Sequence, residues 1–291
     1  MPRSMYKASP LSLLLKQTAT VVLLLFLSLR ALPAAELKRE TAAAWDRYIR
    51  WANEKVQREL SSPGVFLIQN SISAAERASL QASIASGEIA VKPMKGVIPS
   101  GIHFDVPDGE IHHWWGSMLL RNTSIARLLQ LLQDYDHHYE RFSDVERSRL
   151  ISKDGNRYKI FLRLSRSKAF VTTHYDTEQD CVYTLYGSTR ASSQSTATKI
   201  AELENAGTDH ERELPPGKDR GFLWRLVSWW RFEQRGTDVV VELESASLSR
   251  GIPAFIRFMP GISSYIKSTP RETLESVLIS IRDFIDKPSS K

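Results

Sequence analysis

Two histidines and two tryptophans lie next to each other in one short segment of the chain. The segment GEIHHWWGSMLL, residues 109–120, holds His112, His113, Trp114 and Trp115 ahead of an apolar run. Histidine is the commonest metal ligand in proteins, so the pair could hold an ion. The segment has the character of a strand, however, and neighbours on a strand point to opposite faces. The two histidines therefore cannot bind one ion together, whereas the tryptophans indicate a pocket or a membrane surface.

A second pair of metal-ligand types occurs in the segment DYDHHYE. Asp134 and His138 are four residues apart on a predicted helix, a spacing at which side chains share one face. No HExxH or comparable signature accompanies them, so a solvated helix face is the simpler interpretation. The sequence therefore predicts no metal site.

Nucleophilic and nucleotide chemistry have no signature in the chain. GxSxG, GxGxxG and the Walker A pattern are all absent. Cys181 is the only cysteine, which excludes an intrachain disulfide and a zinc-thiolate cluster. We expect Cys181 to be a small buried residue on a strand. The sequence thus predicts no catalytic residue and no cofactor.

The charge of the chain is concentrated at its N-terminus. The formal net charge is +6, but four basic residues precede Glu36, the first acidic residue. These four are Arg3, Lys7, Lys16 and Arg30. Without them the chain has 35 basic and 33 acidic residues, a balance that does not favour nucleic-acid binding.

The same N-terminus has the layout of a secretory signal. A basic start is followed by the apolar run Val21–Leu29 and by the small residues of ALPAAE. The apolar run of about 10 residues is shorter than the roughly 20 that span a bilayer. We expect residues 1–35 to be a signal peptide cleaved near Ala34 or Ala35, with retention as a membrane anchor as the alternative. Both place the rest of the protein outside the cytoplasm, in the periplasm or secreted.

Residues 36–100 are predicted to form an N-terminal helical extension. Its first helix carries an apolar stripe at helical spacing, and SISAAERASLQASIASG indicates a second helix. The stripe consists of Trp45, Tyr48, Ile49, Ala52 and Val56. From residue 101 the pattern changes to one strand over 109–120, one helix over 122–142 and then strand-like runs separated by turns.

The runs FLWRLVSWWRFEQ and VVVELESASLS are typical of a β-hairpin. With Gly236 and Thr237 as its two-residue loop, Arg231 lies opposite Glu242 and Trp229 opposite Glu244. We expect that face to be solvated. The opposite face is broad and apolar, and it either packs as core or lines a cavity. Its residues are Phe222, Trp224, Leu226, Trp230, Phe232, Val239, Val241 and Leu243.

The chain ends with a predicted amphipathic helix. Thr269 is a good N-cap, Pro270 suits the first helical position and Glu272 completes a capping box. An apolar stripe then runs over about four turns. Its residues are Leu274, Val277, Leu278, Ile281 and Ile285.

This order of elements resembles the START-like, helix-grip superfamily, also called SRPBCC. The superfamily includes polyketide cyclases, lipid-transfer domains and coenzyme Q-binding proteins. The resemblance covers residues 102–285 and lies in DGEIHHWWGSMLL, LLQDYDHHYERFSDVERSRLIS, GFLWRLVSWWRFEQRGTDVVVELESASLSRGIP and STPRETLESVLISIR. It implies an α+β domain over residues 101–287, in which a curved antiparallel sheet grips a long C-terminal helix.

The resemblance also implies an apolar cavity between that helix and the sheet. The leading hypothesis is non-enzymatic binding or transfer of a hydrophobic small molecule, such as a lipid, an isoprenoid quinone or a polycyclic compound. Transient contact with a membrane surface is expected. The expected lining residues are Trp114, Met118, Ile160, Leu162, Phe222, Trp224, Trp230, Phe232, Leu278 and Ile281, with His112 as a polar handle at the rim.

Two other functions remain open. A cyclase or aromatase would use polar side chains that converge in the cavity, for which Tyr183, His174 and Arg225 are the candidates. An interaction module would use the N-terminal helices to fill the cavity or to recruit a protein. Because one fold hosts many functions, the site must decide among the three.

Overall fold

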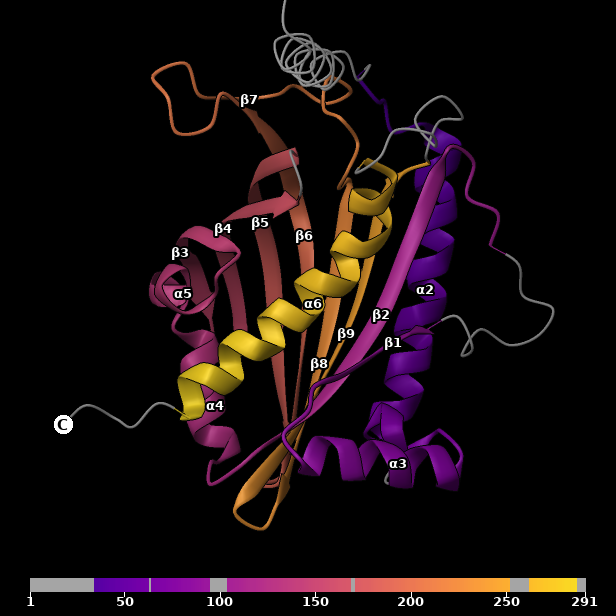
Figure 1. Ribbon diagram of the computed structural model, residues 1–291, viewed down its shortest axis with the longest axis vertical. Coiled ribbons are helices and arrows are strands. Elements are labelled where there is room, and N and C mark those ends of the chain that lie inside the picture. The colour runs from indigo at the N-terminus through magenta and orange to yellow at the C-terminus, as the bar shows by residue number, and fades with distance from the viewer. Residues whose placement is uncertain (1–33, 63, 95–103, 169–170, 252–261, 287–291) are drawn as a thin grey trace, which may run out of the picture. The chain divides into compact units, whose positions relative to one another are not determined.

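The computed structural model describes residues 34–62, 64–94, 104–168, 171–251 and 262–286 (Figure 1). Apart from Ala34 and Ala35, the predicted signal peptide lies outside the described residues. Within the described ranges, no helix is both long and apolar enough to cross a bilayer. Ala35–Lys291 form one compact unit, which is the subject of the following description.

Helices open and close this unit, and strands make up its middle. The elements before the main strands are α2 (Arg39–Ser61), η1 (Ile68–Asn70), α3 (Ala74–Ala85), β1 (Ala90–Pro93), β2 (Gly109–Leu120), α4 (Ile125–Gln133), η3 (Tyr135–His137) and α5 (His138–Arg141). They are followed by β3 (Val145–Asp154), β4 (Arg157–Lys168), β5 (Val171–Tyr186), β6 (Arg190–Glu204), β7 (Arg212–Glu213), β8 (Arg225–Arg235), β9 (Asp238–Arg250) and α6 (Ile262–Asp286).

The strands form one antiparallel sheet in the order β1-β2-β9-β8-β6-β5-β4-β3, with β7 paired to β6. The sheet is open, because its two edge strands do not pair with each other. The C-terminal helix α6 crosses one face of the sheet (Figure 1). This arrangement confirms the predicted α+β fold class with a long C-terminal helix against an antiparallel sheet.

Gly116 on β2 allows α6 to approach the sheet closely. A Cβ atom at this position would lie 2.6 Å from side-chain atoms of both Leu274 and Leu278. Around this contact, α6 and α4 pack their apolar residues against β2, β8 and β9 in one core. The close approach at Gly116 therefore sets the height of α6 above the sheet.

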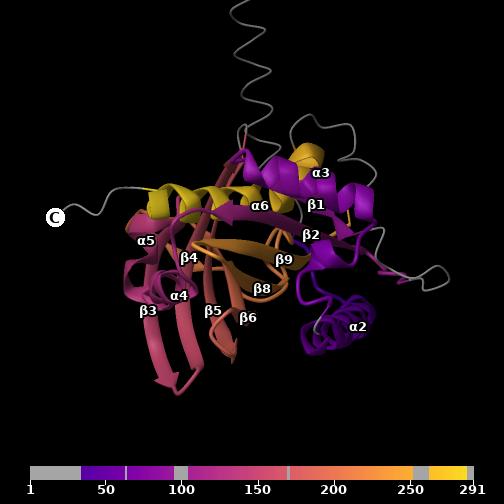
Figure 2. The ribbon, with the colours of Figure 1, turned by 90° about the horizontal axis from the view of Figure 1, so that it is seen from below.

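The N-terminal extension covers the opposite face of the sheet. Trp45 and Tyr48 of α2 pack in one core with Trp229 of β8, and η1 and α3 contribute to a neighbouring core that contains Trp115 of β2. Figure 2 shows α2 and α6 on different sides of the sheet. The helices α2 and α3 therefore lie on the face opposite α6, whereas Ile89 and Val91 at the sheet edge pack against the core under α6.

The predicted hairpin register is confirmed, but the predicted solvated face is wrong. Arg231 pairs with Glu242 and Trp229 with Glu244, as expected for a loop at Gly236 and Thr237. The Arg231 and Glu242 side chains are nevertheless fully buried, because α2 and η1 lie over them. Charged side chains on a strand therefore indicate a solvent-exposed face only where no other element of the fold packs over them and supplies partners.

Two predicted helix boundaries also differ. The helix expected over residues 122–142 is broken at Asp134, whose backbone is not helical and whose carboxylate bonds His137 and Arg141. The last helix begins at Ile262 rather than after Thr269, so Pro270 lies inside it. Proline at this position removes one backbone donor without ending the helix.

A buried cluster of charged side chains attaches α2 to the sheet. Lys55 Nζ lies 3.1 Å from Glu244 Oε1, and Arg231 Nη2 lies 2.6 Å from Glu59 Oε2 and 3.2 Å from Glu244 Oε2. His113 Nε2 is 3.0 Å from Glu244 Oε1. Burial alone would raise the pKa of Glu244, but His113, Lys55 and Arg231 lower it to about 2. Glu244 is therefore an ionised, fully partnered carboxylate.

Glu242 behaves in the opposite way. Its carboxylate accepts hydrogen bonds from the backbone N–H groups of Ile68 and Gln69, at 2.6 and 3.1 Å. Burial raises the pKa of Glu242 to about 7, against the opposing influence of Arg231 and of these N–H groups. The same side chain thus holds η1 on the sheet and titrates near neutrality.

We expect Glu242→Gln to change how stability depends on pH. The native pKa near 7 exceeds the ordinary value of 4.5, so the stabilisation from proton binding is complete below pH 4.5 and disappears as pH rises to 7. Relative to Glu242→Gln, the natural protein should lose up to about 3 kcal/mol across that window. Urea unfolding at pH 5 and pH 8 measures this difference. Glu54→Gln at an exposed position is the control, and parallel pH profiles for Glu242→Gln and the natural protein would contradict the expectation.

Candidate functional site

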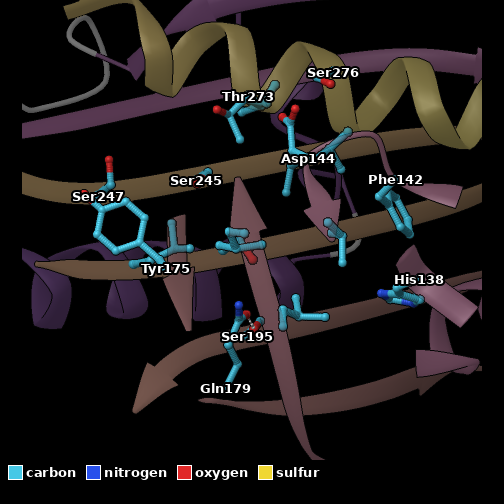
Figure 3. A pocket seen from close by; sticks show the side chains of 18 of the residues that line it. His138, Phe142, Asp144, Tyr175, Gln179, Ser195, Ser245, Ser247, Thr273 and Ser276 are labelled. Atoms are coloured by element: carbon cyan, nitrogen blue, oxygen red, sulfur yellow. Dashed lines mark hydrogen bonds between the residues drawn. The ribbon is translucent and has the colours of Figure 1, made fainter. Parts of the chain in front are cut away.

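A cavity of about 280 Å³ lies between α6 and the sheet. Strands β4, β5, β6, β8 and β9 supply its floor, α6 supplies its roof, and the segment from α4 to β3 closes one end (Figure 3). Much of the wall is apolar, with Ile160 and Leu162 on β4, Leu226 and Trp230 on β8, and Val277 on α6. The volume is close to the lower limit of typical small-molecule pockets.

Small side chains in the middle of the sheet leave the space for this cavity. Cys181, Ser195, Ser228 and Ser245 are direct neighbours across β5, β6, β8 and β9. The same row continues to Tyr158 on one side and Trp114 on the other, so large rings stand only at its ends. Because α6 is held at a fixed height, small residues below it produce a void rather than a collapsed core.

Two tyrosines and a histidine lie at one end of the cavity. The Tyr135 and Tyr183 hydroxyl groups are 2.7 Å apart, and burial raises the pKa of both. His138 Nε2 lies 3.1 Å from the carbonyl oxygen of Leu132. Burial lowers the pKa of His138 to about 4, so the ring is neutral at pH 7. This end of the cavity is therefore polar but uncharged.

Ionic contacts lie where the cavity meets the surface. Arg166 Nη1 binds both oxygens of Asp144, at 3.0 and 3.1 Å, and Arg166 Nη2 is 3.4 Å from Glu272 Oε2 on α6. Ser143 and Ser276 hydroxyl groups are 3.0 Å apart beside them. An adjoining outer hollow shares Arg166, Ser143 and Ser276 with the cavity. These side chains therefore stand between the cavity and the outer hollow.

The structure places four of the predicted lining residues in the cavity wall. They are Ile160, Leu162, Phe222 and Trp230. Whether they contact a ligand stays a prediction.

Five of the other predicted residues belong to the packed core beside the cavity. Met118, Phe232, Leu278 and Ile281 are members of that core, and Trp114 packs against it. Strand alternation does direct Met118, Phe232 and Trp114 to the α6 face, but they pack there with Leu278 and Ile281 of α6 instead of lining the cavity.

Trp224 and His112 are also placed away from the cavity lining. Trp224 packs with Trp45 and Trp229 on the α2 face, because the chain turns at Gly221, with φ of 72°, and strand alternation begins only at Arg225. His112 is buried, with Nε2 3.0 Å from Ser249 Oγ. It does not line the cavity rim in the described residues.

The three candidates for cyclase chemistry are not brought together. Tyr183 lines the cavity, but His174 Nδ1 lies 3.1 Å from Glu146 Oε2 outside it, and Arg225 is exposed. Across the described ranges, no group of three or more His, Cys, Asp or Glu side chains is placed to hold a metal ion.

The row of hydroxyl groups on the floor was missed by the sequence analysis. Its signal is serine at alternate positions of two strands, Ser193 and Ser195 on β6 and Ser245 and Ser247 on β9. Alternation alone places each pair on one face, but the register between β6, β8 and β9 is needed to show that they meet.

No family model matches the chain, and no curated protein matches its sequence. Solved structures with a similar fold include a STAR-related lipid transfer protein from Xanthomonas axonopodis, at 16% identity and TM-score 0.44, covering 63% of this chain and 96% of that chain. The human StarD13 lipid transfer and protein localization domain has 9% identity and TM-score 0.41, covering 75% and 98%.

A third similar structure is the Zhui aromatase/cyclase from a Streptomyces species. It has 12% identity and TM-score 0.37, covering 61% of this chain and 94% of that chain. The α+β fold of this chain, an open antiparallel sheet crossed by α6, rests on its own strand order. With identities of 16% or less and TM-scores of at most 0.44, the similarities assign no ligand or activity to it.

The only cysteine gives a direct probe of the cavity. Cys181 lines the cavity floor on β5 and is buried, as predicted, and burial raises the pKa of its thiol. We expect iodoacetamide to modify Cys181 at least about a hundredfold more slowly in the native protein than in the urea-unfolded chain. Mass spectrometry of timed samples measures both rates. Equal rates would show that Cys181 is open to solvent, which contradicts this geometry.

Proposed function

We propose that this protein binds a hydrophobic small molecule in the cavity beneath α6 and carries or presents it without chemical conversion. The observation that carries the proposal is a void with largely apolar walls, held open by small side chains on the sheet and by the fixed height of α6. A ligand that displaces water there gains about 0.8 kcal/mol for each CH₂ group that it buries.

The ionisation of the lining groups supports a binding role. Burial keeps the Tyr135 and Tyr183 hydroxyl groups and the Cys181 thiol protonated at neutral pH. His138 is neutral, but its Nε2 atom already interacts with the carbonyl oxygen of Leu132. General acid–base catalysis works best with a group whose pKa is near the working pH and that can reach the substrate. None of these four groups combines a pKa near the working pH with a free position from which it can reach a substrate.

The outer hollow supports ligand exchange at a membrane surface. Three of its residues, Tyr139, Ile279 and Phe284, are large hydrophobic side chains that are 48%, 36% and 36% exposed. Apolar side chains around an opening favour contact with an apolar surface. In this proposal the opening beside Arg166 touches a membrane while ligand passes between the bilayer and the cavity.

The proposal is tested by extracting ligand from the protein in its natural host. The protein is to be purified from the periplasmic fraction or the culture medium, where the predicted signal peptide would deliver it. We expect mass spectrometry to find one specific hydrophobic compound in near-stoichiometric amount. Leu226→Trp fills the cavity and should reduce the bound compound at least about tenfold, because the volume is lost. Recovery only from the cytoplasm would overturn the proposed export.

The matched control is Arg225→Trp. Arg225 is the exposed neighbour of Leu226 and points away from the cavity, so the same added ring should leave the bound compound unchanged. Thermal unfolding of both variants checks that they fold. Absence of a bound compound from natural and variant protein alike would overturn the proposed function.

Membrane contact at the outer hollow leads to a separate prediction about rates. We expect Ile279→Ser to slow the transfer of Nile red from the protein to phosphatidylcholine vesicles about fivefold, because less apolar surface meets the bilayer. The amount bound at equilibrium should not change, since Ile279 does not line the cavity. Leu185→Ser is the control, because Leu185 is 64% exposed but lies outside both hollows. Equal slowing in the two variants would count against contact at this opening.

A further inference from the structure

A row of serines crosses the cavity floor at the centre of the sheet. Ser195 on β6 is the direct neighbour of Ser228 on β8, and Ser228 is the direct neighbour of Ser245 on β9. Adjacent strands are about 4.8 Å apart, so the three side chains stand in one line. Ser247 lies two residues beyond Ser245 on the same face of β9. Four hydroxyl groups thus occupy one patch of an otherwise largely apolar wall.

Three of these hydroxyl groups have no protein partner among the described residues. Ser195 Oγ donates to Gln179 Oε1 at 2.6 Å, so its hydrogen is already used. Ser228, Ser245 and Ser247 make no such side-chain bond within the part of the chain that the structure describes. Figure 3 shows Ser245 and Ser247 on the floor, with Thr273 and Ser276 on the helix across the cavity. The free hydroxyl groups therefore face the space where a ligand would lie.

The need for space in the cavity does not by itself explain why these floor positions carry serine. Alanine would leave the same space, and it would avoid burying an oxygen that lacks a partner. A buried hydroxyl without a hydrogen bond costs about 1–3 kcal/mol. Ser247 is buried and Ser228 and Ser245 are partly buried, so each hydroxyl group needs a partner inside the cavity once a ligand displaces water from it. Water can be that partner in the free protein, and a ligand with oxygen atoms can be that partner in the complex.

The charges of the cavity wall restrict the ligand further. Among the described lining residues, Arg166 is the single cation, because His138 is neutral. Arg166 donates two hydrogen bonds to the carboxylate of Asp144. Arg166 also contacts Glu272, so its charge is fully balanced. An ionised carboxylate or phosphate group placed over the serine row would therefore find no cation in the described wall whose charge is still available to balance its own. Burying such a charge costs several kcal/mol.

We propose that the cavity takes an uncharged ligand whose oxygen atoms, as ketone, ester or hydroxyl groups, bond to Ser228, Ser245 and Ser247. The inference rests on the proposed function, because it names the class of molecule that the same cavity binds. Each serine hydroxyl can rotate and can donate or accept. Its apolar surroundings strengthen the bond once water is displaced. The serine row therefore selects for oxygen on one edge of an apolar molecule, and the wall charges select against an ionised head group.

The test compares three probes that share one ring system. Fluorenone has a neutral carbonyl group, fluorene has the same rings without oxygen, and fluorene carboxylate carries a negative charge. Equilibrium dialysis measures their binding to the natural protein and to the double variant Ser228→Ala with Ser245→Ala. We expect the double variant to weaken fluorenone binding more than about tenfold, since two hydrogen bonds are lost. Fluorene binding should not weaken, because fluorene has no oxygen that bonds the two serines, and the carboxylate should bind at least about a hundredfold more weakly than fluorenone.

Two further variants make the outcomes decisive. Ser192→Ala removes a serine of β6 that lies opposite Arg231 and does not line the cavity, and it should affect no probe. Equal loss of fluorenone and fluorene in the double variant, or equal binding of fluorenone and the carboxylate, would overturn the inference and leave the proposed function standing. Failure of all three probes to bind, or binding that persists in Leu226→Trp, would overturn the proposed function itself.

Discussion

The structure depends on the register of the hairpin formed by β8 and β9 at the centre of the sheet. Because side chains alternate along a strand, this register sends Glu242 and Glu244 to one face and Leu243, Ser245 and Ser247 to the other. The first face receives the N-terminal extension, and the second forms the cavity floor. A shift by one residue would place carboxylates in the cavity and serines under α2.

Polar side chains on the two faces of this hairpin differ in how they are satisfied. On the α2 face, Glu244 has Lys55, Arg231 and His113 within 3.2 Å, so its charge is compensated inside the protein. On the α6 face, Ser228 and Ser245 have no partner in the described residues. Satisfied buried polar groups hold a structure together. Polar groups that face a cavity without a protein partner indicate a ligand-binding site. The polar groups of the α2 face therefore attach the extension to the sheet, and those of the α6 face are available to bind a ligand.

Local signals in the sequence predicted the parts of the fold that depend on neighbouring residues. The two-residue loop at Gly236 and Thr237 was enough for the pairing of Arg231 with Glu242, because loop length determines hairpin register. The burial of that pair was not predictable in the same way, because it depends on distant residues. Glu59, which accepts a hydrogen bond from Arg231, lies 172 positions before Arg231 in the chain. Similarly, Ile160 and Trp230 line the cavity while Met118 does not, because the height of α6 is set at Gly116.

The packing of α2 on one face of the sheet offsets the packing that the cavity removes from the other face. A sheet whose central row carries Cys181, Ser195, Ser228 and Ser245 forfeits the 1.5–3 kcal/mol, roughly, that each large buried apolar side chain would supply. The opposite face of the same strands offsets this loss, because Trp229 and its neighbours are covered by α2. The α2 face therefore supplies packing beneath the strands that carry the small residues, while the α6 face holds a packed core around Gly116 and, beside it, a partly polar cavity.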